Sequence, residues 1–167
     1  MSEVLNVTPI ENLTLQERAY QELKKALLTG QVRPGQTLNL RGLAAALGTS
    51  VMPVRDAVGR LAAEQALELM PNRAIRVPVL DRAQFDELWQ LRIEMEGKAA
   101  ALAAERATPE EIAEIAELCA AVRAEAGAGD VAAMLEANSV FHFAIYRSAR
   151  TYILLRIIET LRMQSRI

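Results

Sequence analysis

The chain has 167 residues, of which 51% are hydrophobic, 24% charged and 4% aromatic, and its net charge at pH 7 is −2. This composition is globular and excludes a mostly disordered chain. The single cysteine, Cys119, and the single histidine, His142, exclude an internal disulfide and a multi-histidine metal site. No apolar run is long enough to span a membrane and no signal segment is recognisable, so we expect a cytoplasmic protein with no membrane partner.

The balance of charge changes at about the middle of the chain. Residues 1–80 carry 9 Lys and Arg against 7 Asp and Glu, whereas residues 81–167 carry 10 against 14. A basic first half joined to an acidic second half is typical of a nucleic-acid-binding module linked to a domain with another role. We expect a flexible arm over residues 1–12, a first domain over 13–80 and a second domain over 81–167.

Three helices are predicted in the first half. The first begins at Thr14, which has the spacing of a capping box with Glu17. A short helix is expected over residues 40–47 and a longer one over 51–66, with Gly48 in the turn between them. Two helices joined by a short turn that contains glycine are typical of a helix-turn-helix motif.

A β-hairpin is predicted directly after the third helix. Residues 67–70 and the β-branched residues 75–79 flank the turn signal Pro71-Asn72-Arg73. The remaining segments predict only helices, over residues 81–107, 108–127, 130–148 and from about 151. The predicted fold class is therefore mainly α, with an N-terminal winged helix-turn-helix, a small β-hairpin wing and an all-α helical bundle.

Both halves resemble domains of one family. The first resembles the DNA-binding domain of GntR-type bacterial transcriptional regulators and the second resembles the FCD sensor domain of the FadR-like branch. The motifs that carry the two resemblances are, in chain order, Gly30–Leu38, Arg41–Ala44, Leu47–Ser50, Pro53–Ala57, Arg60–Leu61 and Pro71–Arg73, then Glu87–Glu96, Ala103–Ala104 and Asn138–His142. The resemblance implies a regulator, expected to be a repressor, that binds double-stranded operator DNA as a homodimer and senses a small carboxylate metabolite.

The resemblance implies DNA contacts for several polar residues of the first half. Arg41 and Arg55 match arginines that contact operator DNA in the family, and a guanidinium one turn into a recognition helix reaches guanine O6 and N7. Ser50 is expected to cap its helix and to donate to a phosphate, and Arg73 lies at the wing tip, where a phosphate or minor-groove contact is expected. The alternative for each residue is a solvated charge or a plain helix cap.

The sequence departs from the family pattern at four positions of the first half. Val51 and Met52 stand where the family has Arg and Thr, and Gln65 and Ala74 stand where it has glycine. We expect Val51 and Met52 to contact thymine methyl groups, so that the operator sequence differs from that of relatives with the arginine.

One arginine interrupts an apolar stripe in the second half. Arg92 has the phase of Leu88 and Met95 and is expected to face inward. A buried guanidinium is costly unless it is paired, and its partner is either Glu96, one turn on, or a ligand carboxylate. The resemblance favours the ligand.

Asn138 and His142 are four residues apart and therefore share one face of a helix. From the residues alone, the pair is a core histidine hydrogen-bonded to an amide. In many FCD domains these positions bind an effector and supply metal ligands together with two later histidines, which this chain lacks. Either the chain stops short of a complete FCD domain at Ile167, or the protein lacks the metal site. We expect the former, so that a divalent metal such as zinc would need ligands from a longer chain.

The sequence also bears on two other function classes, an enzyme and a protein-interaction module. One histidine, one cysteine and no phosphate-binding loop leave little catalytic equipment, so we do not expect an enzyme. The alternative to a regulator is a helical protein-interaction module whose winged helix contacts protein. Arg41 and Arg55 at base-reading positions favour DNA.

Overall fold

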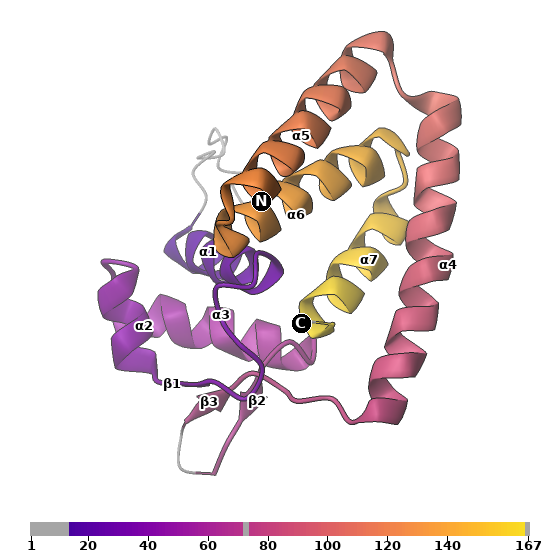
Figure 1. The fold of residues 1–167 in the computed structure, drawn as a ribbon. Helices are drawn as coiled ribbons and strands as arrows, with labels where there is room; N and C mark the ends of the chain where they lie inside the picture. The colour runs from indigo at the N-terminus through magenta and orange to yellow at the C-terminus, as the bar shows by residue number, and fades with distance from the viewer. Residues whose placement is uncertain (1–13, 72–73, 166–167) are drawn as a thin grey trace, which may run out of the picture.

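The first half of the molecule is a winged helix. The computed structural model describes residues 14–71 and 74–165. The elements of the winged helix are α1 (Leu15–Leu28), β1 (Thr37–Leu38), α2 (Leu40–Ala46), α3 (Val51–Ala63), β2 (Glu68–Leu69) and β3 (Ile75–Arg76). They lie at one end of the molecule, with α2 and α3 crossing below α1 (Figure 1).

The core of this part forms between α1 and α3. The buried face of α1 carries side chains such as Leu23 and Leu27, and the buried face of α3 carries Val54, Val58 and Leu61. Burying each of these aliphatic side chains stabilises the fold by roughly 1.5–3 kcal/mol. Because these side chains face inward, the opposite face of α3 is left at the surface.

The wing is part of a three-stranded antiparallel sheet with the order β1-β3-β2. Thr37 and Glu68 both lie opposite Arg76 in the strand register, and the Arg76 guanidinium lies 2.7 Å from the Glu68 carboxylate. The sequence predicted the β2–β3 hairpin but not β1. A strand of two residues is too short to show the alternating pattern that identifies strands.

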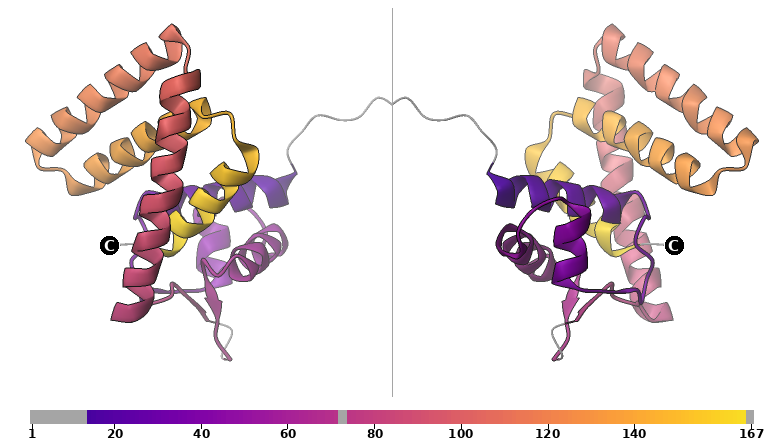
Figure 2. Two further views of the ribbon diagram at one scale, coloured as in Figure 1. Left: turned by 90° about the vertical axis from the view of Figure 1, so that its right-hand side faces the viewer. Right: turned by 90° about the vertical axis from the view of Figure 1, so that its left-hand side faces the viewer.

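The second half contains only helices among its described residues. They are α4 (Arg82–Arg106), α5 (Pro109–Ala128), α6 (Val131–Ser148) and α7 (Tyr152–Gln164). Helices α5 and α6 pair as a hairpin, and α7 lies between α4 and the winged helix (Figures 1 and 2). The mainly α fold class, with a winged helix followed by a helical part, is confirmed.

The helix starts predicted from local capping signals were largely correct. Asp81 and Thr108 each form a complete capping box, and Asp130 accepts a hydrogen bond from the backbone of Ala133. Thr14 caps α1 with one hydrogen bond, but the Glu17 carboxylate does not return it. That carboxylate lies 2.6 Å from Arg60 on α3, because a tertiary ion pair replaces the local contact.

Two expectations for α3 were wrong. Ser50 occupies the N-cap position, but its side chain makes no capping hydrogen bond. The helix ends at Ala63 and not at residue 66, because Gln65 takes the left-handed φ of 58° that stops the helix.

Two apolar cores hold the molecule together, and α7 contributes to both. Met163 lies in the core of the winged helix, and Ile158 lies in the core of the helical part, near Phe143 and Tyr146. Leu28, at the end of α1, packs against both cores. Across the described ranges 14–71 and 74–165, no helix combines the length and apolarity needed to cross a membrane.

Candidate DNA-binding surface and junction pocket

The exposed face of α3 carries the residues that the sequence assigns to base reading. Met52 is 58% exposed and Arg55 is exposed, whereas Val51 is half-buried against the winged-helix core. Arg41 is exposed on the first turn of α2, whose Asn39 side chain accepts a hydrogen bond from the Gly42 backbone at 2.8 Å. The structure therefore presents Arg41, Met52 and Arg55 to solvent and turns much of Val51 inward.

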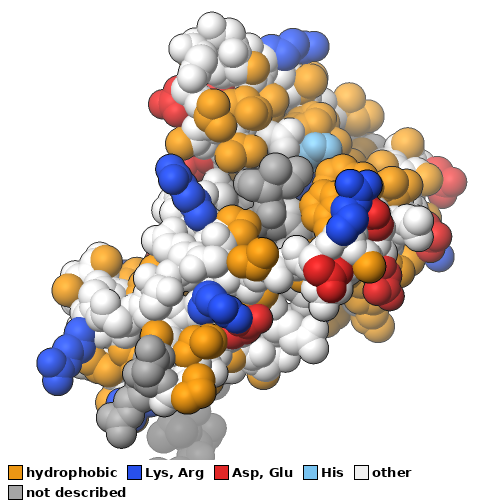
Figure 3. All heavy atoms as spheres, turned by 60° about the horizontal axis from the view of Figure 1, so that its bottom comes forward, with side chains coloured by type: hydrophobic (Ala, Val, Ile, Leu, Met, Phe, Trp, Pro, Cys, Tyr) orange, Lys and Arg blue, Asp and Glu red, His pale blue; other side chains and the backbone are white. Residues whose placement is uncertain are grey.

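Basic residues of the winged helix fall into two groups. The first group is paired with carboxylates and comprises Lys24, Lys25, Arg60 and Arg76. The second group is exposed, forms no ion pair with another described residue and comprises Arg18, Arg33, Arg41 and Arg55. Basic side chains stand apart from one another over the left-hand part of the face in Figure 3, where the winged helix lies. Unpaired guanidinium groups are free to bind phosphates and base edges.

Ser50 and Arg73 complete the residues expected at DNA. The Ser50 hydroxyl is exposed at the start of α3 and is not used in capping, so it is free to donate to a phosphate. Arg73, which the sequence analysis expects at the wing tip, lies outside the described residues.

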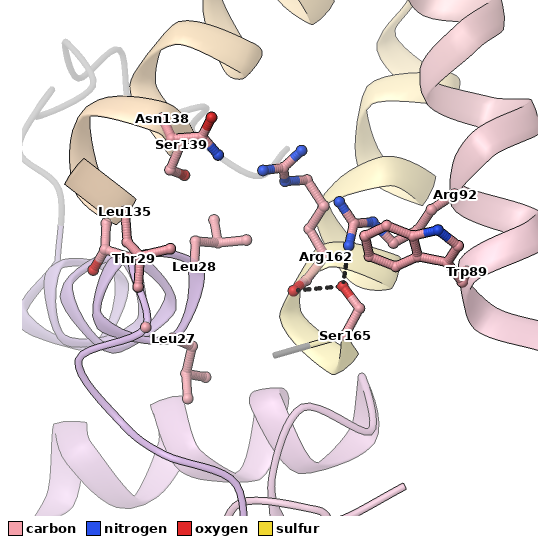
Figure 4. A pocket seen from close by; sticks show the side chains of 11 residues that line it. Leu27, Leu28, Thr29, Trp89, Arg92, Leu135, Asn138, Ser139, Arg162 and Ser165 are labelled. Carbon is pink, nitrogen blue, oxygen red and sulfur yellow. Dashed lines mark hydrogen bonds between the residues drawn. The ribbon is translucent and has the colours of Figure 1, made fainter. Parts of the chain in front are cut away.

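A second candidate site lies where the end of α1 meets α4, α6 and α7, and we call it the junction pocket. Its cavity has a volume of about 180 Å³. The lining residues are Leu27, Leu28, Thr29, Gly30, Trp89, Arg92, Leu135, Asn138, Ser139, Arg162 and Ser165. Figure 4 shows side chains of α4 and α7 on one side, namely Trp89, Arg92, Arg162 and Ser165, and on the other side the leucines together with Thr29, Asn138 and Ser139.

Arg92 faces inward as the sequence predicted. Its Nε donates to Glu96 at 2.7 Å, its Nη1 donates to Ser165 Oγ at 2.9 Å, and its guanidinium lies 4.6 Å from the centre of the Trp89 ring. The internal ion pair with Glu96 is therefore present, and Arg92 also lines the junction pocket. The two expected partners, Glu96 and a ligand, are not mutually exclusive.

Arg162 is a second inward arginine, which the sequence analysis missed. Its Nη1 donates to Glu96 and to the Tyr146 hydroxyl oxygen, both at 3.1 Å. A signal for it exists, because Arg162 follows the buried Ile158 by one helical turn on the apolar stripe of α7. Arg92 was recognised by the same kind of interruption.

The carboxylate between the two arginines is held ionised. Burial alone would raise the pKa of Glu96, but hydrogen bonds from Arg92 and Tyr146 and the charge of Arg162 outweigh burial and lower it. Burial, followed by the hydrogen bond to Glu96, raises the pKa of Tyr146, so its hydroxyl stays protonated and acts as a donor.

Asn138 and His142 both lie on α6, but their side chains have different neighbours. The Asn138 side chain lines the junction pocket, whereas the His142 ring packs beside Tyr146, with Nδ1 at 3.3 Å from the Tyr146 hydroxyl oxygen. Burial, and then the charge of Arg162, lower the pKa of His142, which favours the neutral ring. Within the described part of the chain, no group of three or more His, Cys, Asp or Glu is placed to hold a metal ion.

Comparison with known proteins assigns both parts of the chain. Residues 15–77 match the family described as bacterial regulatory proteins, gntR family, and residues 87–167 match the FCD domain. The HTH-type transcriptional regulator McbR of Escherichia coli (strain K12) is 38% identical over 150 residues, which are 90% of this chain and 67% of that protein. The Nta operon transcriptional regulator of Aminobacter aminovorans is 32% identical over 129 residues, or 77% of this chain and 61% of that protein.

The solved structure of E. coli McbR/YncC has the same arrangement. It superposes with a TM-score of 0.87 at 35% identity, over 93% of this chain and 73% of that one. The chain spans 61% to 67% of the length of the two curated relatives. On these matches, the chain belongs to the GntR family of bacterial transcriptional regulators and carries the family's DNA-binding domain followed by an FCD domain.

Proposed function

We propose that the chain is a ligand-responsive regulator whose winged helix, over residues 13–80, binds operator DNA. The observation that carries this proposal is the exposure of Arg33, Arg41 and Arg55 without ion-pair partners among the described residues. Lys24, Lys25, Arg60 and Arg76 are paired with carboxylates, so Arg41 and Arg55 carry the unpaired positive charge of α2 and α3.

In this proposal α3 enters the major groove. Arg55 then makes a two-pronged contact with guanine, and Met52 contacts a thymine methyl group, with Val51 adding the part of its side chain that is exposed. Arg41 and the Ser50 hydroxyl bind the backbone or a base edge at the groove wall. We expect the wing to contact the adjacent backbone, with Arg73 as its phosphate or minor-groove contact.

In this proposal, two copies of the chain bind a palindromic operator as a homodimer. Two copies of α3 read two half-sites in neighbouring turns only if the protein has two-fold symmetry. We propose repression as the sign of regulation on the family resemblance alone.

The helical part, over residues 81–167, is proposed to sense a small carboxylate. Arg92 supplies a planar two-pronged donor and Asn138 supplies an amide in the junction pocket. His142 is linked to this site indirectly, because its ring contacts the Tyr146 hydroxyl, which accepts a hydrogen bond from Arg162. As metal ligands, Asn138 and His142 would leave most of the coordination to water, so a divalent metal would need further ligands beyond the described residues.

The test of DNA binding is Arg55→Ala. A duplex is first selected by the wild-type protein from random sequences, and affinities are then measured by gel shift at one salt concentration. We expect Arg55→Ala to lose about 1–3 kcal/mol of binding free energy. Arg123→Ala, which removes an exposed arginine of α5, is the matched control and should bind like wild type.

Unchanged affinity in Arg55→Ala would reject this base contact. Failure of the wild-type protein to select any duplex would favour the alternative in which the winged helix contacts protein.

A further inference from the structure

Along the chain, only a short connection joins the winged helix to the helical part. Residues 77–81, between β3 and α4, form no helix or strand. Val77 is buried in the winged-helix core, but Val79 is 64% exposed. Two parts joined in this way move relative to each other unless an apolar interface holds them. The direction in which α3 points is therefore not fixed by the connection.

The last turns of α7 supply an apolar interface between the two parts. Met163 is 1% exposed and lies in the winged-helix core, whereas Ile158, on the same helix, is buried in the core of the helical part. Leu28, at the end of α1, packs against both cores. Detaching α7 would leave a hole where the Met163 side chain now fills the winged helix, and such holes are costly.

Polar contacts surround this apolar centre. Lys24 on α1 lies 2.6 Å from Glu159 on α7, and this pair is largely buried, with side chains 13% and 25% exposed. Gln164 Nε2 donates to the backbone oxygen of Glu64, just after α3, at 3.2 Å. Because the contacts fall on two helices at separate points, the winged helix is not free to pivot on Met163.

The orientation of α3 decides which operators two joined copies can read. One extra base pair between two half-sites moves the second half-site by about 3.4 Å along the duplex and turns it by roughly 35° around the axis. A dimer whose winged helices cannot turn then reaches only one half-site. It reads both only if α7 detaches from the winged helix.

We propose that the docking of α7, through Met163, Glu159 and Gln164, fixes the orientation of α3 and so makes this regulator selective for one spacing between half-sites. This inference rests on the proposed function, with two copies joined through their helical parts. Arg55 on α3 then selects the sequence of each half-site, and α7 selects the distance between them. The three residues of α7 are positioning residues, since they act through the placement of α3.

Gel shifts on a series of duplexes test this proposal. The series contains the duplex selected by the wild-type protein, the same duplex with base pairs added or removed between the half-sites, and a duplex with a single half-site. For a change of one base pair, we expect the wild-type protein to lose affinity by on the order of 100-fold, because both half-sites are no longer bound together. The single half-site reports on the reading of DNA by α3 alone.

The variant Glu159→Lys with Gln164→Ala weakens the docking and removes no side chain from the winged-helix core. The new lysine faces Lys24, so a largely buried attraction becomes a repulsion. We expect the affinity loss for a one-base-pair change to shrink by at least about tenfold, because α7 detaches more easily once this pair is broken. Affinity for the single half-site should equal that of wild type, which a merely structural defect in the winged helix would not allow.

Glu125→Lys is the matched control for charge. It makes the same change of charge at an exposed position of α5. It should keep the wild-type loss of affinity on every duplex of the series.

A longer connection tests the same point independently. A short Gly-Ser insertion after Val79 loosens the chain between β3 and α4 and leaves the docking contacts of α7 in place. In an otherwise wild-type protein it should leave the spacing selectivity unchanged, because α7 and not the connection holds the winged helix. If the double variant does not fold, the insertion alone decides the question.

Three results would overturn the inference. They are a wild-type protein that binds duplexes of different spacing equally well, a folded double variant that keeps the wild-type selectivity, and an insertion that relaxes the selectivity by itself. If Arg55→Ala still loses affinity for the selected duplex in the same preparations, the DNA-binding function stands and only this inference fails.

Discussion

Gln65 adopts a backbone conformation that is unfavourable for a residue with a side chain. Its φ is 58°, in the left-handed region, at the position where the family resemblance implies glycine. This conformation costs a side-chain-bearing residue roughly 1–2 kcal/mol. The exposed side chain of Gln65 has no packing role that compensates. A departure from the motif at this residue therefore lowers stability without removing the wing.

Gln65→Gly is expected to raise the free energy of unfolding by about 0.5–1 kcal/mol, because the relief of strain exceeds the added entropy of the unfolded chain. Urea denaturation measures the change. Gln90→Gly, at an exposed position inside α4, is a control that should lower stability by about 1 kcal/mol. A loss of stability in Gln65→Gly would show that strain is not released there.

His142 contributes a pH dependence whose sign follows from its surroundings. Burial and Arg162 lower its pKa in the folded state, so the unfolded chain binds a proton more readily. Stability from the neutral ring is therefore present above the unfolded pKa of about 6.5 and is lost as the pH falls below it.

His142→Gln should flatten the loss of stability between about pH 7 and pH 5, because the glutamine does not titrate. Thermal unfolding of both proteins across this range provides the measurement. Parallel stability curves for variant and wild type would contradict the assigned environment of the ring.

Three helices of the second half are joined by one carboxylate. Glu96 on α4 accepts hydrogen bonds from Tyr146 on α6 and from Arg162 on α7, in addition to Arg92. The predicted helices and most of their caps were correct, because caps and glycine stops are local signals. The junction between helices was only half predicted, because Arg162 is 66 residues from Glu96 and no local pattern links them.

Glu96→Gln is expected to destabilise the fold by about 3 kcal/mol at pH 7, since it leaves two largely buried guanidinium groups without their counter-charge. The lowered pKa of Glu96 means that this difference is complete above about pH 4.5 and shrinks as the pH falls through the folded-state value. Chemical denaturation of wild type and variant at pH 7 and at a pH well below about 4.5 measures this difference in the free energy of unfolding. Glu94→Gln, an exposed neighbour, should be neutral, and a similar loss in both variants would contradict the role of Glu96.

At the scale of the whole molecule, the winged helix is joined directly to the helical part through α7. The wing and α3 lie at one end, the α4–α5 turn lies at the other, and α7 lies between them (Figure 2). The sequence was sufficient to predict the two folds and the exposed arginines. It did not predict that Met163 would enter the winged-helix core, because the docking of α7 depends on contacts distant in the chain.

The most direct measurement is the binding of the wild-type protein to its selected duplex and to a scrambled duplex over a range of salt concentrations. We predict that the selected sequence contains two symmetric half-sites about 10 base pairs apart and binds two chains. It should bind at least ~10³-fold more tightly than the scrambled duplex, with an affinity that falls steeply as salt rises. Equal affinity for the two duplexes, or binding of the selected duplex that salt does not weaken, would contradict a DNA-reading winged helix.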